Sequence, residues 1–183
     1  LIAIILTLII ISGEIDLSIA SMIALTAVIF GTVYNAGFGM PLSVFIALIS
    51  GILCGLFNGI LVTKLKIPSI ILTIGTLTLY RGIAQSLASD FSLGGYPSWF
   101  IGIDYRYVGI VPIPVIIFTV FALIVGFILS STIYGKQLYL IGTNPITAKY
   151  SGIKVDRIKL LLFTLSGLIS GVAGVLTTSR LAV

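Results

Sequence analysis

The stretch PLSVFIALISGILCGLFNGILVT occupies residues 41–63 and contains no charged side chain. A helix that crosses the hydrocarbon core of a bilayer needs about 20 mostly apolar residues, and this stretch meets that requirement. Comparable apolar runs precede and follow it along the chain. The sequence therefore predicts a fold built from membrane-spanning helices.

Helices are the expected element because backbone groups exposed to lipid must find their hydrogen-bond partners within the segment. The alternating segments of about ten residues that are typical of a membrane β-barrel do not occur in the sequence. We expect an all-α, polytopic transmembrane helix bundle with about five to six spans. The expected spans are residues 1–11, 17–34, 41–63, 68–88, 112–131 and 160–178.

The composition excludes several classes of protein. Of the 183 residues, 58% are hydrophobic and only 8% are charged, whereas about 25% of a soluble domain is charged. A soluble enzyme and a disordered tail are excluded. The chain has no histidine and a single cysteine, Cys54, so an internal disulfide, a His-based metal site and a Ser-His couple are excluded too. Because the chain begins within an apolar run, we expect residues 1–183 to be one transmembrane domain from an internal piece of a longer protein.

Charged residues collect in the links between the expected spans. The net charge is +2 in the 64–66 link, −1 in the 89–111 link and +4 in the 132–159 link. Since excess Lys and Arg mark cytoplasmic loops, we expect the first and third links inside and the second outside. The charges are Lys64 and Lys66; Asp90, Asp104 and Arg106; and Lys136, Lys149, Lys154, Asp156, Arg157 and Lys159, while the outer link adds the expected interfacial aromatics Tyr96, Trp99, Tyr105 and Tyr107.

Residues 12–18, SGEIDLS, place two carboxylates between apolar runs. Ionised groups near membrane depth usually face protein or water. Gly13 permits an irregular backbone, and Asp16 can cap the helix that follows. Two interpretations stay open: a broken helix that lines a transport path with Gly13, Glu14, Asp16 and Ser18 at its break, or a loop and helix cap at the membrane surface.

Small residues recur at every fourth position in two of the expected spans. Such stripes let the backbones of neighbouring helices approach closely. We therefore expect them to pack helices rather than to bind a ligand. The stripes are Ala47, Gly51, Gly55 and Gly59 in one span, and Gly167 and Gly171, beside Ser166, Ser170 and Gly174, in the other.

Polar residues within the spans are candidates for a transport path. Thr78, Arg81 and Gln85 share one face of a helix at about 100° per residue. Arg81 lies about 20 Å beyond Pro68 along the helix axis, so it either snorkels to the outer surface or lines a polar cavity. Asn58 is a further candidate, although an interhelical hydrogen bond is the favoured interpretation.

The long basic link contains signals for a short helix. Asn144 is a good N-cap, Pro145 suits the first helical position, and Gly152 suits the position after the last turn. These signals predict a helix at 145–151. It is too short to be stable alone in water, so it needs a partner surface, which is either the lipid interface or a soluble protein that docks from the cytoplasm.

Three segments together carry a family resemblance. They are SGEIDLSIAS at 12–21, FNGILVTKLKIPSIILTIGTLTLYRGIA at 57–84, and YGKQLYLIGTNPITAKYSGIKVDRIK at 134–159, followed by SGLISGVAGVLTTSR. This set resembles the permease subunits of bacterial ATP-binding cassette (ABC) sugar importers, in the branch of the ribose, rhamnose and autoinducer-2 systems. The resemblance covers nearly the whole chain in order, and permeases of this family are considerably longer.

The resemblance implies roles for the matching positions. The 12–20 segment resembles the family's signature loop, but Glu14 stands where a second Gly is expected and Ala20 where Gly is common. The 144–152 segment resembles the coupling helix that docks on the ATPase subunit. The docking residues implied in this way are Asn144, Pro145, Thr147, Ala148, Lys149, Ser151 and Gly152.

The function implied by the resemblance is inward transport of a sugar or sugar-like signal across the bacterial inner membrane. The implied partners are a cytoplasmic ATP-binding subunit, a second permease chain in a homo- or heterodimer, an extracytoplasmic solute-binding protein and the lipid bilayer, but no nucleic acid. The chain contains no G-x-x-x-x-G-K-[ST] motif. We therefore expect ATP on the partner subunit, and no cofactor, metal or enzymatic activity on this chain.

Two other classes of protein compete with this interpretation. An ion-coupled secondary transporter would use Glu14 and Asp16, but it would not require the long basic link with its short helix. Dependence of uptake on a partner ATPase, as against collapse by an ionophore, separates these two classes. An intramembrane protease is disfavoured because the chain lacks both His and a Gly-x-Gly-Asp motif.

Overall fold

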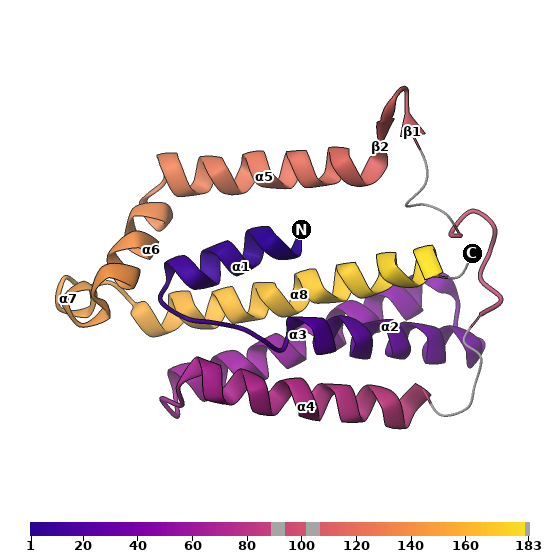
Figure 1. Cartoon of the computed structure of the whole chain (residues 1–183), viewed down its shortest axis with the longest axis horizontal. Coiled ribbons are helices and arrows are strands. Elements are labelled where there is room, and N and C mark those ends of the chain that lie inside the picture. The colour runs from indigo at the N-terminus through magenta and orange to yellow at the C-terminus, as the bar shows by residue number, and fades with distance from the viewer. Residues whose placement is uncertain (89–93, 102–106, 182–183) are drawn as a thin grey trace.

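The computed structural model describes residues 1–88, 94–101 and 107–181. Within these ranges the chain is all-α, as predicted, apart from one small hairpin (Figure 1). The elements in chain order are α1 (Ile2–Ile11), α2 (Ile19–Asn35), α3 (Met40–Thr63), α4 (Ser69–Ala88), β1 (Tyr107–Val108), β2 (Val111–Pro112), α5 (Ile113–Ser131), α6 (Ile133–Thr143), α7 (Pro145–Tyr150) and α8 (Val155–Leu181).

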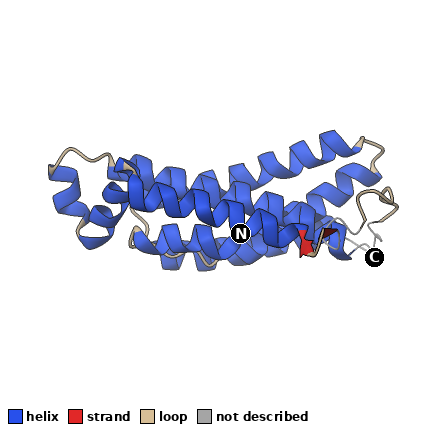
Figure 2. Cartoon of the chain, turned by 90° about the horizontal axis from the view of Figure 1, so that it is seen from above, coloured by secondary structure: helices blue, strands red, loops and turns tan. Residues whose placement is uncertain are grey.

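Four helices, α3, α4, α5 and α8, are long and apolar enough to cross a membrane. The two shorter apolar helices, α1 and α2, follow one another across residues 12–18. The long helices run along one common axis, and the antiparallel hairpin of β1 and β2 lies at the end that holds the C-terminus (Figure 2). The described residues thus form the predicted polytopic bundle.

The centre of the bundle is the pair α3 and α8, which share the most extensive helix contact in the described chain. Helix α2 packs on α3, α4 and α8, and α1 packs on α8 and α6. Helix α5 stands apart (Figure 1), and Val125 is the only residue of α5 that is buried. Residues of α5 therefore remain available to lipid or to further protein.

The observed helices correct the predicted bounds in three places. Helix α8 begins at Val155, five residues before the predicted span at 160–178. Residues 133–143, predicted as loop, form α6, with the Thr132 side chain accepting a hydrogen bond from the Gly135 N–H at 3.3 Å. The short helix α7 ends at Tyr150, one residue earlier than predicted.

Links with opposite net charge lie at opposite ends of the bundle, as the charge pattern predicts. The 64–66 link and the start of α8 meet through an ion pair of 2.7 Å between Lys66 Nζ and Asp156 Oδ1. The hairpin of β1 and β2, which begins within the predicted outer link, lies at the opposite end from α7 (Figure 1). Asp90, Asp104, Tyr105 and Arg106 of this link lie outside the described residues.

The prediction that Tyr96 is an interfacial aromatic is wrong. Its side chain is only 6% exposed and packs in an aromatic cluster with Phe30, Tyr34 and Phe100. Its ring stacks on Phe30 and lies tilted against Tyr34 and Phe100, and aromatic pairs of this kind stabilise a core. Trp99 and Tyr107 are exposed, as interfacial aromatics should be.

Candidate functional site

The break between α1 and α2 packs against the bundle with one of its sides. Helix α1 ends at Ile11, and Gly13 adopts a left-handed backbone with φ of +79°, which turns the chain away from the helix axis. Ser166, which binds this break, is about 17 Å from the start of α8, close to the middle of a helix of about 40 Å. Within residues 12–18, Ser12, Asp16 and Ser18 are buried in the bundle, whereas Gly13, Ile15 and Leu17 are exposed on its outside.

Asp16 is the centre of a buried hydrogen-bond network in this break, and it is only 2% exposed. Its Oδ1 accepts hydrogen bonds from the backbone N–H and the hydroxyl of Ser18, at 2.9 and 2.7 Å. Its Oδ2 accepts a hydrogen bond from the Ser166 hydroxyl at 3.1 Å. The N-cap of α2 is Ser18 and not Asp16, so the carboxylate holds the turn before the cap and ties it to α8.

The network continues across two further helices. The Asn58 amide of α3 donates to the Ser18 hydroxyl at 2.8 Å. The Tyr80 hydroxyl of α4 donates to Asn58 Oδ1 at 3.0 Å and also lies 2.9 Å from the Cys54 carbonyl. Asn58 is fully buried, so the structure places it between helices and not on an open path.

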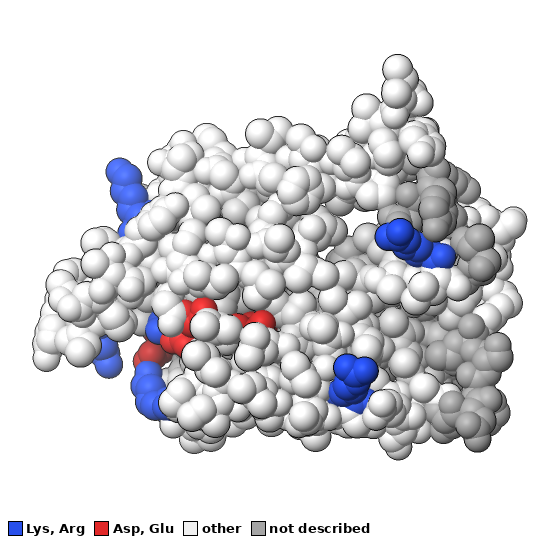
Figure 3. Space-filling view, viewed as in Figure 1, with Lys and Arg blue, Asp and Glu red and all other residues white. Residues whose placement is uncertain are grey.

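Two ion pairs surround the break at the end that carries α7. Glu14 pairs with Lys159 of α8, and both side chains are 14% exposed. The Lys66–Asp156 pair is more open, with side chains 63% and 45% exposed. Figure 3 shows the acidic side chains of this face gathered among basic ones near that end of the molecule. The Glu at the position where the family signature has Gly is therefore a partnered residue.

The small-residue stripes of α3 and α8 face each other. A Cβ added at Gly55 would lie 2.9 Å from the backbone nitrogen of Gly167 and would overlap the carbonyl oxygen of Phe163. Added Cβ atoms at Gly51 and Gly167 would overlap the opposite backbone as well. Cβ atoms added at Gly59 and Gly171 would lie 2.9–3.4 Å from side-chain or backbone atoms of the partner helix.

Capping residues fix both ends of helix α7. The Asn144 side chain accepts hydrogen bonds from the N–H groups of Ile146 and Thr147, both at 3.0 Å. Ser151 is its C-cap, and Gly152 follows with a left-handed φ of +83°. These two ends hold six residues in a helix that is too short to persist alone in water.

The orientation of α7 corrects the expectation that Ala148 faces a docking partner. Ala148 is 3% exposed and packs against Ile141 of α6 and Val155 of α8. The outward face instead presents Ile146, which is 68% exposed, and Tyr150, which is 89% exposed. Part of the stabilisation that α7 needs therefore comes from this chain, and its large apolar side chains point away from it. Thr147, Lys149, Ser151 and Gly152 are exposed too.

Two glycines of α6, which lie outside the predicted small-residue stripes, let α6 pack closely against the ends of α1 and α5. A Cβ added at Gly142 would overlap the Ile11 carbonyl oxygen at the end of α1. A Cβ added at Gly135 would overlap the Leu129 carbonyl oxygen at the end of α5. Both lie within the segment that carried the resemblance, but Gly142 meets a residue far away in the sequence, whereas Gly135 meets the end of the preceding helix.

The other path candidates lie apart from the break. Thr78, Arg81 and Gln85 are exposed on α4 and contact no other helix closely enough to be buried. The Thr78 hydroxyl donates to the Gly75 carbonyl within α4 at 2.7 Å. The structure thus groups these three residues on one open face of α4 and keeps them separate from the buried network of Asp16 and Asn58.

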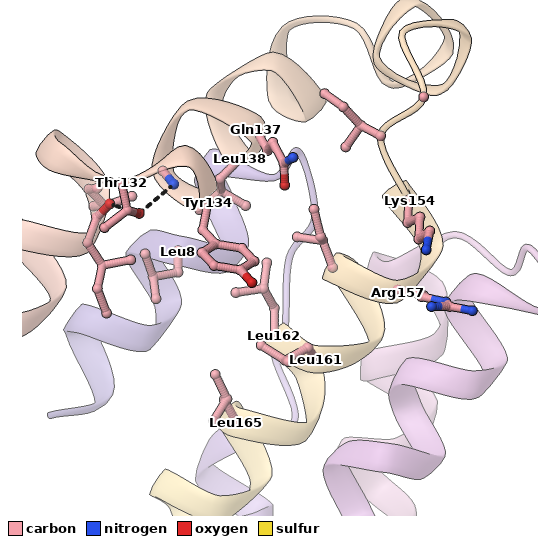
Figure 4. Close-up of a pocket in the computed structure, with 16 residues that line it drawn as sticks. Leu8, Thr132, Tyr134, Gln137, Leu138, Lys154, Arg157, Leu161, Leu162 and Leu165 are labelled. Atoms are coloured by element: carbon pink, nitrogen blue, oxygen red, sulfur yellow. Dashed lines mark hydrogen bonds between the residues drawn. The ribbon is translucent and has the colours of Figure 1, made fainter.

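A cavity of about 820 Å³ opens beside α7, between α6, α8 and the end of α1. Its wall is mostly apolar, with Leu8, Leu161 and Leu165 among the side chains that surround it (Figure 4). Lys154 and Arg157 lie along one side of it (Figure 4). Few polar groups are present to replace the water around a sugar, so this cavity does not suit a hydrophilic solute.

Comparisons with known proteins agree with this architecture. The model of the family described as "Branched-chain amino acid transport system / permease component" matches residues 1–183. The chain is 37% identical over 185 residues to the "Autoinducer 2 import system permease protein LsrD" of Escherichia coli O9:H4 (strain HS), of E. coli (strain K12) and of Shigella flexneri. No solved structure matches it.

Each of these alignments covers 98% of this chain and 56% of the relative, so the chain spans about half the length of the curated relatives it matches. The predicted resemblance to permeases of ABC importers is confirmed by these matches, and the helices long enough to cross a membrane agree with a multi-pass protein of the bacterial inner membrane. The chain belongs to the family of permease components of the branched-chain amino acid transport systems.

Proposed function

We propose that this chain is part of the permease subunit of an ABC importer that carries a small sugar-like solute, of the ribose, rhamnose or autoinducer-2 type, into the cell. A separate cytoplasmic subunit binds and hydrolyses ATP, and an extracytoplasmic binding protein delivers the solute. The permease chain itself carries out no chemical reaction. The similarity to permeases named for autoinducer 2 import supports this solute class.

The observation that carries the proposal is the outward face of α7. A monomeric transporter has no need to present Ile146 and Tyr150 to water at the tip of a rigid, capped helix. Exposed apolar side chains on a fixed helix are typical of a surface that another protein covers. The neighbouring Lys149 adds a positive charge to this face. We assign the face to the ATP-binding subunit.

The two carboxylates of the break favour an ATP-driven importer over an ion-coupled transporter. A carboxylate that binds and releases H⁺ or Na⁺ in each cycle needs access to water. Asp16 is 2% exposed and accepts three hydrogen bonds, and Glu14 is paired with Lys159. Both carboxylates are therefore engaged in holding the break in place.

The solute path in this proposal runs along the open face of α4 between two permease chains. Thr78, Arg81 and Gln85 offer hydrogen-bond donors and acceptors on that face. A polar side chain that faces lipid is costly, whereas one that lines a water-filled path is not. A second copy of the permease, or a related chain, would enclose the other side of the path.

The docking assignment is tested with the full-length permease and its ATP-binding subunit. The double variant Ile146→Ser with Tyr150→Ser should lose co-purification of the ATP-binding subunit while the permease keeps its melting temperature. The matched control is Ile110→Ser, which removes an apolar side chain that is 94% exposed beside the hairpin at the other end of the bundle. Undiminished co-purification of the double variant would refute the docking surface.

A further inference from the structure

The pair of Glu14 and Lys159 joins two segments that are 145 residues apart in sequence. Glu14 belongs to the break between α1 and α2, and Lys159 lies in the second turn of α8. Both side chains are 14% exposed, so water screens their attraction only weakly. The contact is therefore a stiff link between the break and the start of α8.

The start of α8 is in turn attached to α7. Ala148 of α7 packs against Val155, and the Ile153 N–H donates to the Ala148 carbonyl at 3.1 Å. Only residues 151–154 separate the two helices. A displacement of α7 is thus passed to the first turns of α8 and reaches Lys159 about 6 Å further along the helix axis.

Stability alone does not account for an ion pair in this position. Removing two charges from water costs free energy that their attraction often fails to recover, and apolar replacements of a buried pair are frequently neutral or stabilising. The break is also already held by the hydrogen bonds of Asp16 and by one from the Ile15 N–H to the Ser69 hydroxyl at 3.1 Å. The pair adds a directional connection to α8.

We propose that Glu14 and Lys159 are positioning residues that transmit the movement of α7 to the break in the membrane helix. This inference rests on the proposed function, since it requires a subunit that moves α7. The break changes position with α8 because the Glu14 carboxylate follows the Lys159 ammonium. The link couples ATP hydrolysis to the opening of the path without touching either the nucleotide or the solute.

The test uses the full-length permease with its ATP-binding subunit and binding protein in proteoliposomes, and it measures ATP hydrolysed per solute taken up. Glu14→Gln and Lys159→Met remove one charge each with little change of shape. Each single variant leaves the other charge without its partner and should lower the melting temperature. It should nevertheless keep the ATP-binding subunit bound, while the ratio rises about tenfold, within the usual range of coupling between sites. The double variant Glu14→Lys with Lys159→Glu, which restores a pair, should recover most of the coupling.

The matched control is Asp156→Asn, which breaks the exposed pair with Lys66 and should leave the ratio near that of the wild type. The inference is overturned if either single variant keeps the wild-type ratio, if Asp156→Asn raises it equally, or if the exchanged pair recovers nothing. Absence of ATP-dependent uptake in the wild-type complex would instead overturn the proposed function, and this inference with it.

Discussion

Replacing Gly55 by Ala should separate the two central helices of the bundle. The added methyl group would lie 2.9 Å from the backbone nitrogen of Gly167 and 3.0 Å from its Cα. Favourable contacts between such atoms need about 3.5–4.0 Å, and the methyl group would also overlap the Phe163 carbonyl oxygen. Helices α3 and α8 would therefore have to move apart by at least about 1 Å at this point. Backbone atoms cannot turn aside as a flexible side chain can.

The expected loss of stability follows from this displacement of the two helices. A gap of 0.5–1 Å forfeits about a quarter to a half of the attraction between the atoms that it separates. Overpacking of this kind destabilises proteins by about 1–3 kcal/mol. For a domain of this size each kcal/mol shifts the melting temperature by about 2–4 °C, so Gly55→Ala should lower Tm by roughly 2–12 °C.

Gly75→Ala on α4 is the matched control, because an added Cβ there meets nothing within 4 Å. Alanine is the better helix former by about 1 kcal/mol, so this variant should keep or raise Tm. The assay is thermal unfolding of the full-length permease in detergent or lipid nanodiscs. Equal melting temperatures for Gly55→Ala and Gly75→Ala would show that the glycine stripe does not set the distance between α3 and α8.

Two further predictions follow from the network and the charge pattern. Asn58→Ala removes one of the two buried hydrogen-bond partners of the Ser18 hydroxyl and one of the two of the Tyr80 hydroxyl. It should destabilise the protein by about 1–3 kcal/mol, more than Tyr80→Phe does. Thermal unfolding of both variants checks this order. In a Cys54→Ala background, a cysteine in place of Gly95 should react with an impermeant maleimide added to intact cells, whereas labelling only after permeabilisation would reverse the assigned topology.

The membrane-spanning helices are largely predictable from the sequence, since apolar runs have only one stable form in lipid. The predicted span at 41–63 corresponds to α3 (Met40–Thr63), and that at 112–131 to α5 (Ile113–Ser131). The start of α8 is missed because four charged residues at 154–159 interrupt the apolar run. A helix can continue beyond the lipid. Two of these charged residues, Asp156 and Lys159, form the ion pairs with Lys66 and Glu14.

For the short helix α7, the local sequence signals predict the position but not the orientation. Its N-cap Asn144 and the Gly152 that follows its C-cap can be recognised in the sequence, and they predict its position to within one residue. Its orientation depends on whether Ala148 or Ile146 faces α6 and α8, and no feature within the six residues decides that. In the structure the small side chain of Ala148 faces inward and packs against Ile141 of α6 and Val155 of α8.

The buried hydrogen-bond network is also only partly predictable from the sequence. Asp16 and Asn58 are recognisable as costly polar groups in an apolar surrounding. Their partners, Tyr80 and Ser166, lie on other helices and have no distinguishing pattern in the sequence. Only the three-dimensional arrangement shows that these four residues and Ser18 form one chain of hydrogen bonds.

A measurement of the energy source for uptake tests the proposed ABC-importer function most directly. The measurement is uptake of labelled solute, with ribose and autoinducer 2 as the probes, into proteoliposomes that hold the full-length permease, its ATP-binding subunit and its binding protein. We predict that uptake of one probe requires ATP and the ATP-binding subunit, and that it is unchanged by an ionophore that collapses ion gradients. Uptake that continues without the ATP-binding subunit and stops with the ionophore would contradict the account.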